Sequence, residues 1–454
     1  MATQTLVDVE RGLVSAGAYS DEEVYREELE RVFGHTWLFV GHESCIPLVG
    51  DYITNYMGED SVIVLRDAAS SVRVFLNKCL HRGNQVCLFD RGQTKTFTCS
   101  FHGWQYDTQG RLVGVPFFDT AYQGGLNRDE LKLVEPPRIE TYGGMIFASW
   151  DANIVPLRDY LGEFTWYLDR LLVHEHLGGM QVVGGRQRFF MPTNWKLLAD
   201  NFAGDDYHVP TTHASYFKIM AGRSESFSSA RSVLDDALQV CVGYGAGVPH
   251  GLGVLRLGPA ASLYESDLAT AERLGAEAVD WVKERYRRIQ ERYGNDPVQV
   301  QVFSNANIFP NLSMINSGAA FLARGLIQWH PRGPLLSEGW EWCVVEKDAP
   351  KVVKEQAIKA LMTRQSAAGM IQSDDTENFE RSSDNLAAHV ARKQPFHYDM
   401  AMGFDRDHPV LQAFKDKGWA IEHLPGLVGP FNWEVNQRQF YRYWAELMAA
   451  KGSE

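Results

Sequence analysis

The pattern of hydrophobic and polar residues changes along the chain. Near residue 20, Ser20 and Glu23 fit a capping box, and apolar residues then recur at helical spacing to about residue 33. From about residue 37 to residue 150, short alternating runs such as residues 61–65 are separated by Gly, Asp and Asn. Such runs are typical of strands joined by tight turns. This part of the chain therefore predicts a small, mostly antiparallel β domain.

Beyond residue 151 the pattern mixes helices with strands. We expect helices over residues 159–172, 194–207, 266–293 and 348–368. Because helices and strands are grouped instead of alternating, the pattern favours an antiparallel α+β layer over a doubly wound sheet. No glycine-rich phosphate loop follows a strand, so we expect no nucleotide-binding domain. The predicted fold class is α+β, with one domain at residues 38–155 and a second formed by residues 1–37 and 156–454.

Composition narrows the classes of function. The 454 residues carry 44 Lys plus Arg against 57 Asp plus Glu, a net charge of −13 that is the wrong sign for binding nucleic acid or anionic membranes. Six scattered cysteines are too few for a disulfide framework. No apolar run approaches bilayer length, and the first residues lack the features of a signal peptide. We therefore expect a soluble, cytoplasmic protein with no nucleic-acid or membrane partner.

Two short loops of the predicted β domain combine cysteine with histidine. They read Cys79-x-His81 and, after an interval, Cys99-x2-His102. Two thiolates and two imidazoles that converge could hold tetrahedral zinc, or a [2Fe–2S] cluster in which cysteines bind one iron and histidines the other. Because each loop offers one thiolate and one imidazole, the spacing favours the cluster.

The two loops, extended by Arg-Gly after His81 and by Gly-Trp after His102, resemble the Rieske motif of ring-hydroxylating dioxygenase large subunits. The resemblance implies that Cys79, His81, Cys99 and His102 bind a [2Fe–2S] cluster. Ferredoxins are generally acidic, so docking one would need a local basic patch. The candidate basic residues beside the loops are Lys78, Arg82, Arg91 and Lys95.

A second group of candidate ligands lies near residue 208. His208 and His213 are five apart, which would place them about 140° apart on a regular helix, but Pro210 is expected to break the helix between them. Asp205 could orient His208 from the same helical face. A two-histidine iron site also needs a carboxylate, and the best candidates are the paired aspartates at residues 374 and 375.

The segment from Asn201 to His213, Asn-Phe-x-Gly-Asp-x-Tyr-His-x4-His, resembles the mononuclear-iron motif of the same family. The resemblance implies that His208, His213 and Asp375 bind Fe(II), with Asp374 as the alternative carboxylate. It also implies that Asn201 lines the site and that Asp205 couples it to the cluster of an adjacent subunit. The chain departs from many relatives at residue 200, which is Asp instead of Glu, and from some at residue 210, which is Pro instead of Gly.

The family resemblance implies the large subunit of a terminal oxygenase. Such an enzyme converts an aromatic hydrocarbon, O2 and two electrons to a cis-dihydrodiol; the alternative is a Rieske monooxygenase, a demethylase or a hydroxylase of an aromatic acid. Expected partners are a small beta subunit in an α3β3 assembly, a ferredoxin and its NAD(P)H-dependent reductase. The predicted substrate-pocket residues, mostly apolar, are Phe202, Val209, Phe217, Asn305, Asn307 and Ile308.

Two other classes of protein fit the motifs less well. A Rieske electron carrier that catalyses no reaction would need the β domain alone. The long remainder of the chain argues against such a carrier. A zinc-stabilised binding protein would be colourless, whereas a Rieske protein is reddish brown. The visible absorption spectrum therefore separates these classes.

Overall fold

The computed structural model describes residues 6–221, 237–255, 260–294, 303–317, 324–406, 408–416 and 421–450. The chain forms two compact units, Phe33–Leu157 and the combination of Met1–Val32 with Arg158–Glu454. Within the described ranges, no helix is both long enough and apolar enough to cross a bilayer.

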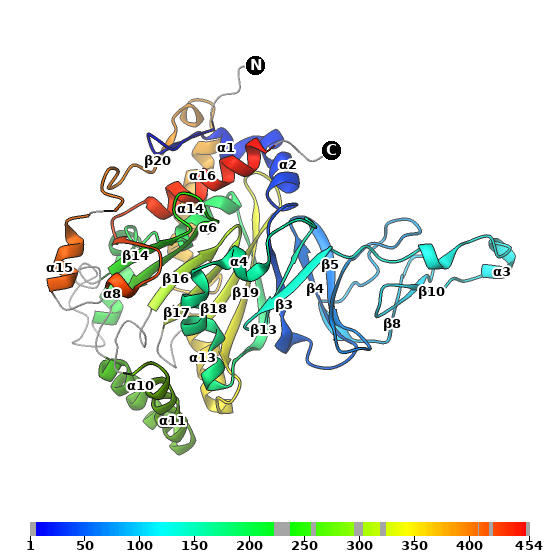
Figure 1. Ribbon diagram of the computed structural model, residues 1–454, viewed down its shortest axis with the longest axis horizontal. Coiled ribbons are helices and arrows are strands. Elements are labelled where there is room, and N and C mark those ends of the chain that lie inside the picture. The colour runs from blue at the N-terminus through cyan, green and yellow to red at the C-terminus, as the bar shows by residue number, and fades with distance from the viewer. Residues whose placement is uncertain are drawn as a thin grey trace. The chain divides into compact units, whose positions relative to one another are not determined.

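The smaller unit consists of antiparallel strands, drawn from blue to cyan in Figure 1. Some are joined by short turns, and longer loops follow β6 and β10. Its strands form three sheets, ordered β6-β5-β4-β7, β10-β9-β8 and β11-β12-β3. Residues 62–65 of β5 are all fully buried, so this strand is covered on both faces. The strands are β3 (Leu38–His42), β4 (Asp51–Met57), β5 (Asp60–Arg66), β6 (Val72–Leu76), β7 (Arg91–Gln93), β8 (Thr96–Thr98), β9 (Gln105–Asp107), β10 (Leu112–Gly114), β11 (Arg138–Tyr142) and β12 (Met145–Ser149). Short helical turns are η1 (Glu43–Cys45), α3 (Phe118–Ala121) and η2 (Arg128–Glu130).

The larger unit is organised around an eight-stranded antiparallel sheet of order β13-β19-β18-β17-β16-β15-β14-β21. The strands are β13 (Met180–Met191), β14 (Ala237–Val242), β15 (His250–Leu255), β16 (Phe303–Ile308), β17 (Leu312–Ser317), β18 (Arg324–Pro331), β19 (Ser337–Glu346) and β21 (Leu427–Pro430). Every residue of β18 is buried, polar residues included. A small second sheet joins β1 (Val7–Asp8), β2 (Leu13–Val14) and β20 (Phe396–His397).

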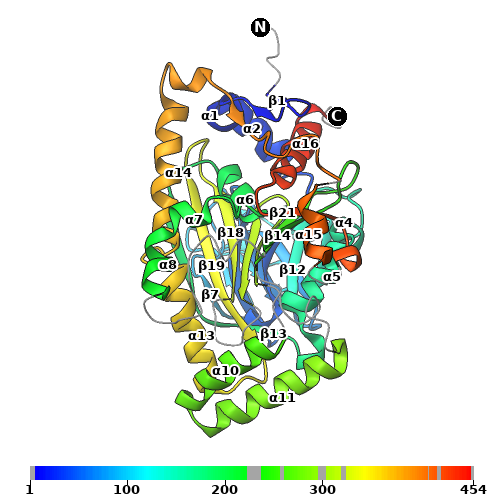
Figure 2. The same cartoon turned by 90° about the vertical axis from the view of Figure 1, so that its left-hand side faces the viewer.

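Helices cover this sheet, as Figure 2 shows. Helix α6 packs on β16, β17 and β18, α13 packs on β18 and β19, and α16 packs on β14 and β15. The helices are α1 (Gly17–Ser20), α2 (Glu22–Arg31), α4 (Leu157–Leu161), α5 (Phe164–Leu168), α6 (Trp195–Phe202), α7 (Val209–Thr212), α8 (Ala214–Ala221), α10 (Ala260–Leu274), α11 (Ala276–Tyr293), α13 (Lys351–Arg364), α14 (Gln372–Ala387), α15 (Val410–Asp416) and α16 (Val435–Ala449). Shorter helical turns are η3 (Asp169–Val173), η4 (Glu175–Leu177), η5 (Ala391–Lys393) and η6 (Ile421–His423).

Glycines divide two of the helices that the sequence predicted as single. The helix expected over residues 266–293 is two helices, α10 and α11, because Gly275 adopts a φ of +116° between them. The helix expected over residues 159–172 is likewise interrupted at Gly162, where φ is +51°. Left-handed backbone of this kind ends a helix and is easiest for glycine. The helix expected over residues 348–368 is also shorter, and corresponds to α13.

Candidate functional site

The two Cys/His loops of the smaller unit have the same backbone geometry. In each loop, a glycine four residues after the cysteine donates its N–H to the cysteine carbonyl: Gly83 to Cys79 at 2.9 Å and Gly103 to Cys99 at 3.0 Å. Both glycines have positive φ, +76° and +73°. A residue with a Cβ would be strained at either position. The glycines therefore allow each loop to turn tightly around its cysteine.

The side chains of these loops form a compact group in which the thiols are buried and the imidazoles are half-buried. Both Cys79 and Cys99 are free thiols, each about 2% exposed. The rings of His81 and His102 have centroids 4.5 Å apart, and His81 also stacks on Trp104 at 5.0 Å. Burial opposes ionisation of Cys99, but hydrogen bonds from backbone N–H groups and neighbouring side chains outweigh it and lower the pKa of the thiol.

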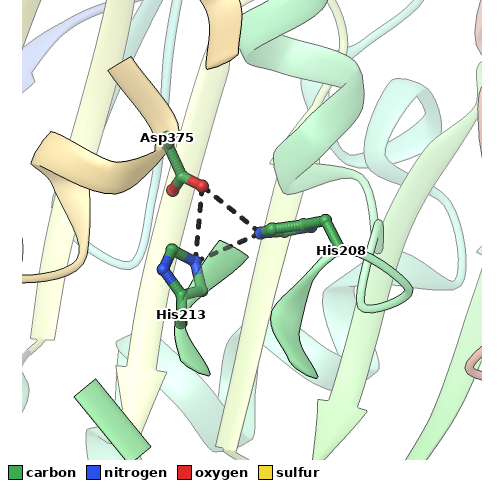
Figure 3. A group of neighbouring side chains, drawn as sticks. All are labelled: His208, His213 and Asp375. Carbon is green, nitrogen blue, oxygen red and sulfur yellow. Dashed lines mark hydrogen bonds and ion pairs between the residues drawn. The ribbon is translucent and has the colours of Figure 1, made fainter. Parts of the chain in front are cut away.

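In the larger unit, three side chains converge from two helical segments (Figure 3). His208 precedes α7 and His213 follows it, while Asp375 lies in the first turn of α14. Asp375 Oδ1 lies 3.4 Å from His208 Nε2 and 3.3 Å from His213 Nε2, and the two Nε2 atoms are 3.2 Å apart. Pro210 is the second residue of α7 and does not break a longer helix, which corrects the local prediction.

A second carboxylate lies beside the other ring nitrogen of each histidine. Asp205 Oδ2 is 3.4 Å from His208 Nδ1, and Asp374 Oδ2 is 3.5 Å from His213 Nδ1. Burial opposes protonation of His208, but Asp205 and Asp375 outweigh it and raise the pKa of the imidazole. Burial lowers the pKa of His213. Each imidazole thus has a carboxylate within ion-pair distance of its Nδ1 atom, while its Nε2 atom faces Asp375.

The segment before His208 leaves the helix earlier than the sequence predicted. The expected helix over residues 194–207 ends at Phe202, since Gly204 has a φ of +115°. Asp205 therefore reaches His208 from a turn and not from a helical face. Strand β15 makes room for this turn, because a Cβ at Gly251 would lie 2.3 Å from the carbonyl oxygen of Ala203.

Two of the three converging residues, His208 and Asp375, border a hollow of about 500 Å³ in the larger unit. Most of its lining comes from α6, α14 and the segment around β20. The lining residues are Leu197, Asp200, Asn201, Asp205, His208, Thr212, Asp375, Asn378, Phe379, Ser382, Pro395, Phe396, His397 and Tyr398. Five of them are acidic or imidazole-bearing side chains, so a substantial part of the wall is polar.

Family models match both units of the chain. Residues 36–134 match the Rieske [2Fe-2S] domain, and residues 157–450 match the ring hydroxylating alpha subunit (catalytic domain). This chain belongs to the ring-hydroxylating alpha subunits.

Relatives of this ring-hydroxylating alpha subunit cover nearly its whole length. Biphenyl 2,3-dioxygenase subunit alpha of Rhodococcus jostii (strain RHA1) is 36% identical over 98% of this chain and 91% of the relative. Benzene 1,2-dioxygenase subunit alpha of Pseudomonas putida is 35% identical over 98% and 93%. The crystal structure of naphthalene 1,2-dioxygenase from Rhodococcus sp. bound to indole matches with a TM-score of 0.77 and 32% identity, over 97% and 95%.

These similarities confirm the predicted family, the α+β fold class and the enzyme class. The alpha subunit is an oxidoreductase of the ring-hydroxylating dioxygenase type, which incorporates O2 into aromatic rings. It has a Rieske [2Fe–2S] domain and a catalytic domain that binds mononuclear iron. The relatives are subunits of multicomponent systems, so partner subunits and electron-transfer components are also implied.

The side chains present fit both iron groups. Two buried free thiols and two imidazoles are the donor set of a Rieske cluster, and the buried His81 Nδ1 has no hydrogen-bond partner among the described residues. One ligand atom from each of His208, His213 and Asp375 lies within 4.8 Å of the others, as two histidines and one carboxylate on iron require.

The lining of the hollow includes none of the predicted substrate-pocket residues whose side chains the structure describes, so their role stays a prediction. Phe202 is buried against Trp329, and Val209 is 8% exposed in α7. Asn305, Asn307 and Ile308 lie on β16, where Asn307 already donates to the carbonyl oxygen of Pro310 and accepts from Ser313. The side chain of Phe217 lies outside the described residues.

Sequence reasoning missed several residues of the site. Tyr398 and His397 reach the hollow from a segment without any motif, so no local signal identified them. Asp206 lies outside the lining of the hollow but close enough to His208 for their charges to interact, and burial raises the pKa of this 1% exposed carboxyl group to about 8. Asn378 could have been found, because it lies four residues after Asp374 on one helix, and it donates to Thr212.

Replacing Asp375 with Ala should abolish binding of the mononuclear iron. The change removes the oxygen that faces both Nε2 atoms and leaves the smaller unit untouched. Iron and sulfide analysis, together with the visible spectrum, should show loss of that iron with the cluster colour retained.

Asp374→Ala is the matched control for that variant. Because Asp374 contacts the outer nitrogen of His213, its loss should weaken iron affinity by about 10- to 100-fold without preventing occupancy at saturating iron. An Asp375→Ala protein that keeps its iron, with an Asp374→Ala protein that loses it, would reverse the assignment.

Proposed function

We propose that this chain catalyses cis-dihydroxylation of an aromatic hydrocarbon by O2 and two electrons. The observation that carries the proposal is the triad of His208, His213 and Asp375, present in the same chain as a Rieske domain. Biphenyl, benzene and naphthalene, in the names of the relatives, are all uncharged arenes. They favour dioxygenation of an arene over the alternative of a monooxygenase or a hydroxylase of aromatic acids.

We assign the ligands of the two iron groups from the geometry. Cys79, Cys99, His81 and His102 hold the [2Fe–2S] cluster, in a domain that we place at residues 38–155. His208, His213 and Asp375 hold Fe(II), in a domain formed by residues 1–37 and 156–454. The distances of 3.2–3.4 Å among the facing atoms of the triad support this second assignment.

The chain's own residues position and polarise this site. Bound Fe(II) would supply the redox-active centre and the open positions that oxygen chemistry needs. Asp205 and Asp374 fix the orientation of the two imidazoles from their Nδ1 sides. The Asn201 side chain lies 3.5 Å from His208 Nδ1 and lines the hollow, so it helps to hold the same ring.

The electrons originate in partner proteins, because the sequence predicts no nucleotide-binding domain in this chain, and they enter through the Rieske domain. We propose that a reductase oxidises NAD(P)H and passes electrons to a ferredoxin, which docks beside the cluster loops. Lys78, Arg82, Arg91 and Lys95 are all exposed there and can contact an acidic partner. A small beta subunit in an α3β3 assembly and a cytoplasmic location complete the proposal.

The direct test of this function is the fate of labelled oxygen. With the reductase, ferredoxin, NAD(P)H and ¹⁸O2, the purified oxygenase should convert naphthalene or biphenyl to a cis-diol that carries label in both hydroxyl groups. Mass spectrometry of the product distinguishes the alternatives. A product with one labelled oxygen would identify a monooxygenase.

Asp205 should be needed for electron transfer and not for metal binding. Its side chain is 37% exposed while its carboxylate contacts His208, so it can link that imidazole to a cluster histidine of an adjacent copy of the chain. Asp205→Ala should retain both iron groups and lose product formation by about 100-fold, an effect at the upper end for an outer partner of a metal site.

Asp384→Ala is a suitable control, since Asp384 is an exposed residue of α14 outside the lining of the hollow. Reduction of the cluster and reoxidation by the iron site can be followed separately by stopped-flow absorbance. If the cluster of the Asp205→Ala protein is reoxidised at the normal rate, Asp205 does not couple the two iron groups.

A further inference from the structure

A buried carboxyl group, distinct from the ligand set, borders the hollow. Asp200 lies on α6, is about 6% exposed, and lines the hollow together with Asn201, His208 and Asp375. Neighbouring Asn201 contacts His208, so the two residues at the end of α6 face the same space. Asp200 has no ligand role in the proposed function.

Two tyrosines hold this carboxyl group in place, and a third contacts one of them. Asp200 Oδ2 accepts a hydrogen bond from the Tyr398 hydroxyl at 3.0 Å and a short one from the Tyr441 hydroxyl. Tyr19 extends the chain of hydroxyl groups, since its oxygen lies 3.0 Å from that of Tyr398. Both tyrosine bonds go to Oδ2, and no hydrogen bond from a described side chain engages Oδ1. The second oxygen of Asp200 is therefore left for the hollow.

The reaction proposed above consumes protons as well as electrons. An arene, O2, two electrons and two protons give one cis-dihydrodiol, in which two C–O and two O–H bonds have formed and the O–O bond has broken. The electrons come from the reduced ferredoxin through the cluster. The protons must come from a group near the site or from solvent.

The surroundings keep Asp200 able to carry a proton at neutral pH. Burial raises the pKa of Asp200 to about 8, the hydrogen bonds from Tyr441 and Tyr398 lower it, and the charges of Asp205 and Glu434 raise it. The nearby ammonium group of Lys196 is paired with buried Glu28. The carboxyl group is thus protonated below about pH 8 and ionised above it.

We propose that Asp200 is the proton-supplying residue of the hollow during ring hydroxylation, and that Tyr398 and Tyr441 tune it. This inference rests on the proposed function. In each transfer the O–H bond of Asp200 breaks, water in the hollow accepts the proton, and an oxygen of the product finally receives it. The hollow, about 500 Å³, has room for several such waters. Solvent then reprotonates the carboxylate through the same water.

The proposal predicts a specific dependence of product formation on pH. In single turnovers of the reduced, iron-loaded enzyme, the wild-type rate of diol formation should fall as pH rises through about 8, because Asp200 ionises. Asp200→Asn keeps the size of the side chain but cannot give up a proton. Its diol formation should be at least about 10-fold slower, in the range expected for loss of general acid–base catalysis, and should lack this fall. Asp200→Glu should restore the rate of diol formation and its fall with rising pH.

Tyr398→Phe tests the same idea without removing the carboxyl group. Loss of a hydrogen bond that favours the ionised carboxylate should move the fall in rate to higher pH. Tyr160→Phe is the matched control: Tyr160 is a buried tyrosine that donates to the carbonyl oxygen of Phe309, so the fall should stay in place. A purely structural role for Tyr398 would lower the rate at every pH without this shift.

Iron content and the cluster spectrum of each variant show whether the iron groups remain. The inference is overturned if Asp200→Asn keeps the wild-type rate and pH profile, or if Tyr398→Phe leaves the fall where it was. Loss of iron from Asp200→Asn would also count against it, since Asp200 would then be structural. If the wild-type enzyme makes no diol, the proposed function itself fails, and the two failures are therefore distinguishable.

Discussion

Everything at the catalytic end of this chain depends on placing one buried carboxylate between two imidazoles. Asp375 lies within 3.4 Å of the facing nitrogens of His208 and His213, although more than 160 residues separate it from them along the chain. A buried carboxylate in an apolar environment is costly unless it is paired or binds a metal. The larger unit meets this requirement by bringing the first turn of α14 against the two ends of α7.

Strand β15 and two further carboxylates, Asp205 and Asp374, help to place the two histidines beside Asp375. Strand β15 carries glycine at residues 251 and 253, where side chains would collide with the turn that leads to His208. Asp205 and Asp374 then hold the outer nitrogens of the rings, so each imidazole can present its Nε2 atom. The same arrangement leaves a hollow beside His208 and Asp375.

How much of this was predictable depends on whether a feature is local in sequence. The two Cys/His loops each lie within a few residues, so spacing alone indicated their chemistry, and Gly83 and Gly103 signalled the tight turns. The distant Asp375 needed the family resemblance, because paired aspartates on a helix usually face solvent. Tyr398 and Tyr441 could not be predicted, since nothing in their local sequence relates them to Asp200. Predicted helix boundaries were wrong at several places where a single glycine adopts positive φ.

The central claim is that one polypeptide holds two separate iron groups. One is a cluster that stores an electron, and the other is a mononuclear iron that uses it. Iron and acid-labile sulfide in the anaerobically purified protein test this most directly. The account predicts about three irons and two sulfides per chain, with one iron removed by a chelator while the reddish-brown colour persists. Zinc in place of iron, or no sulfide at all, would contradict it.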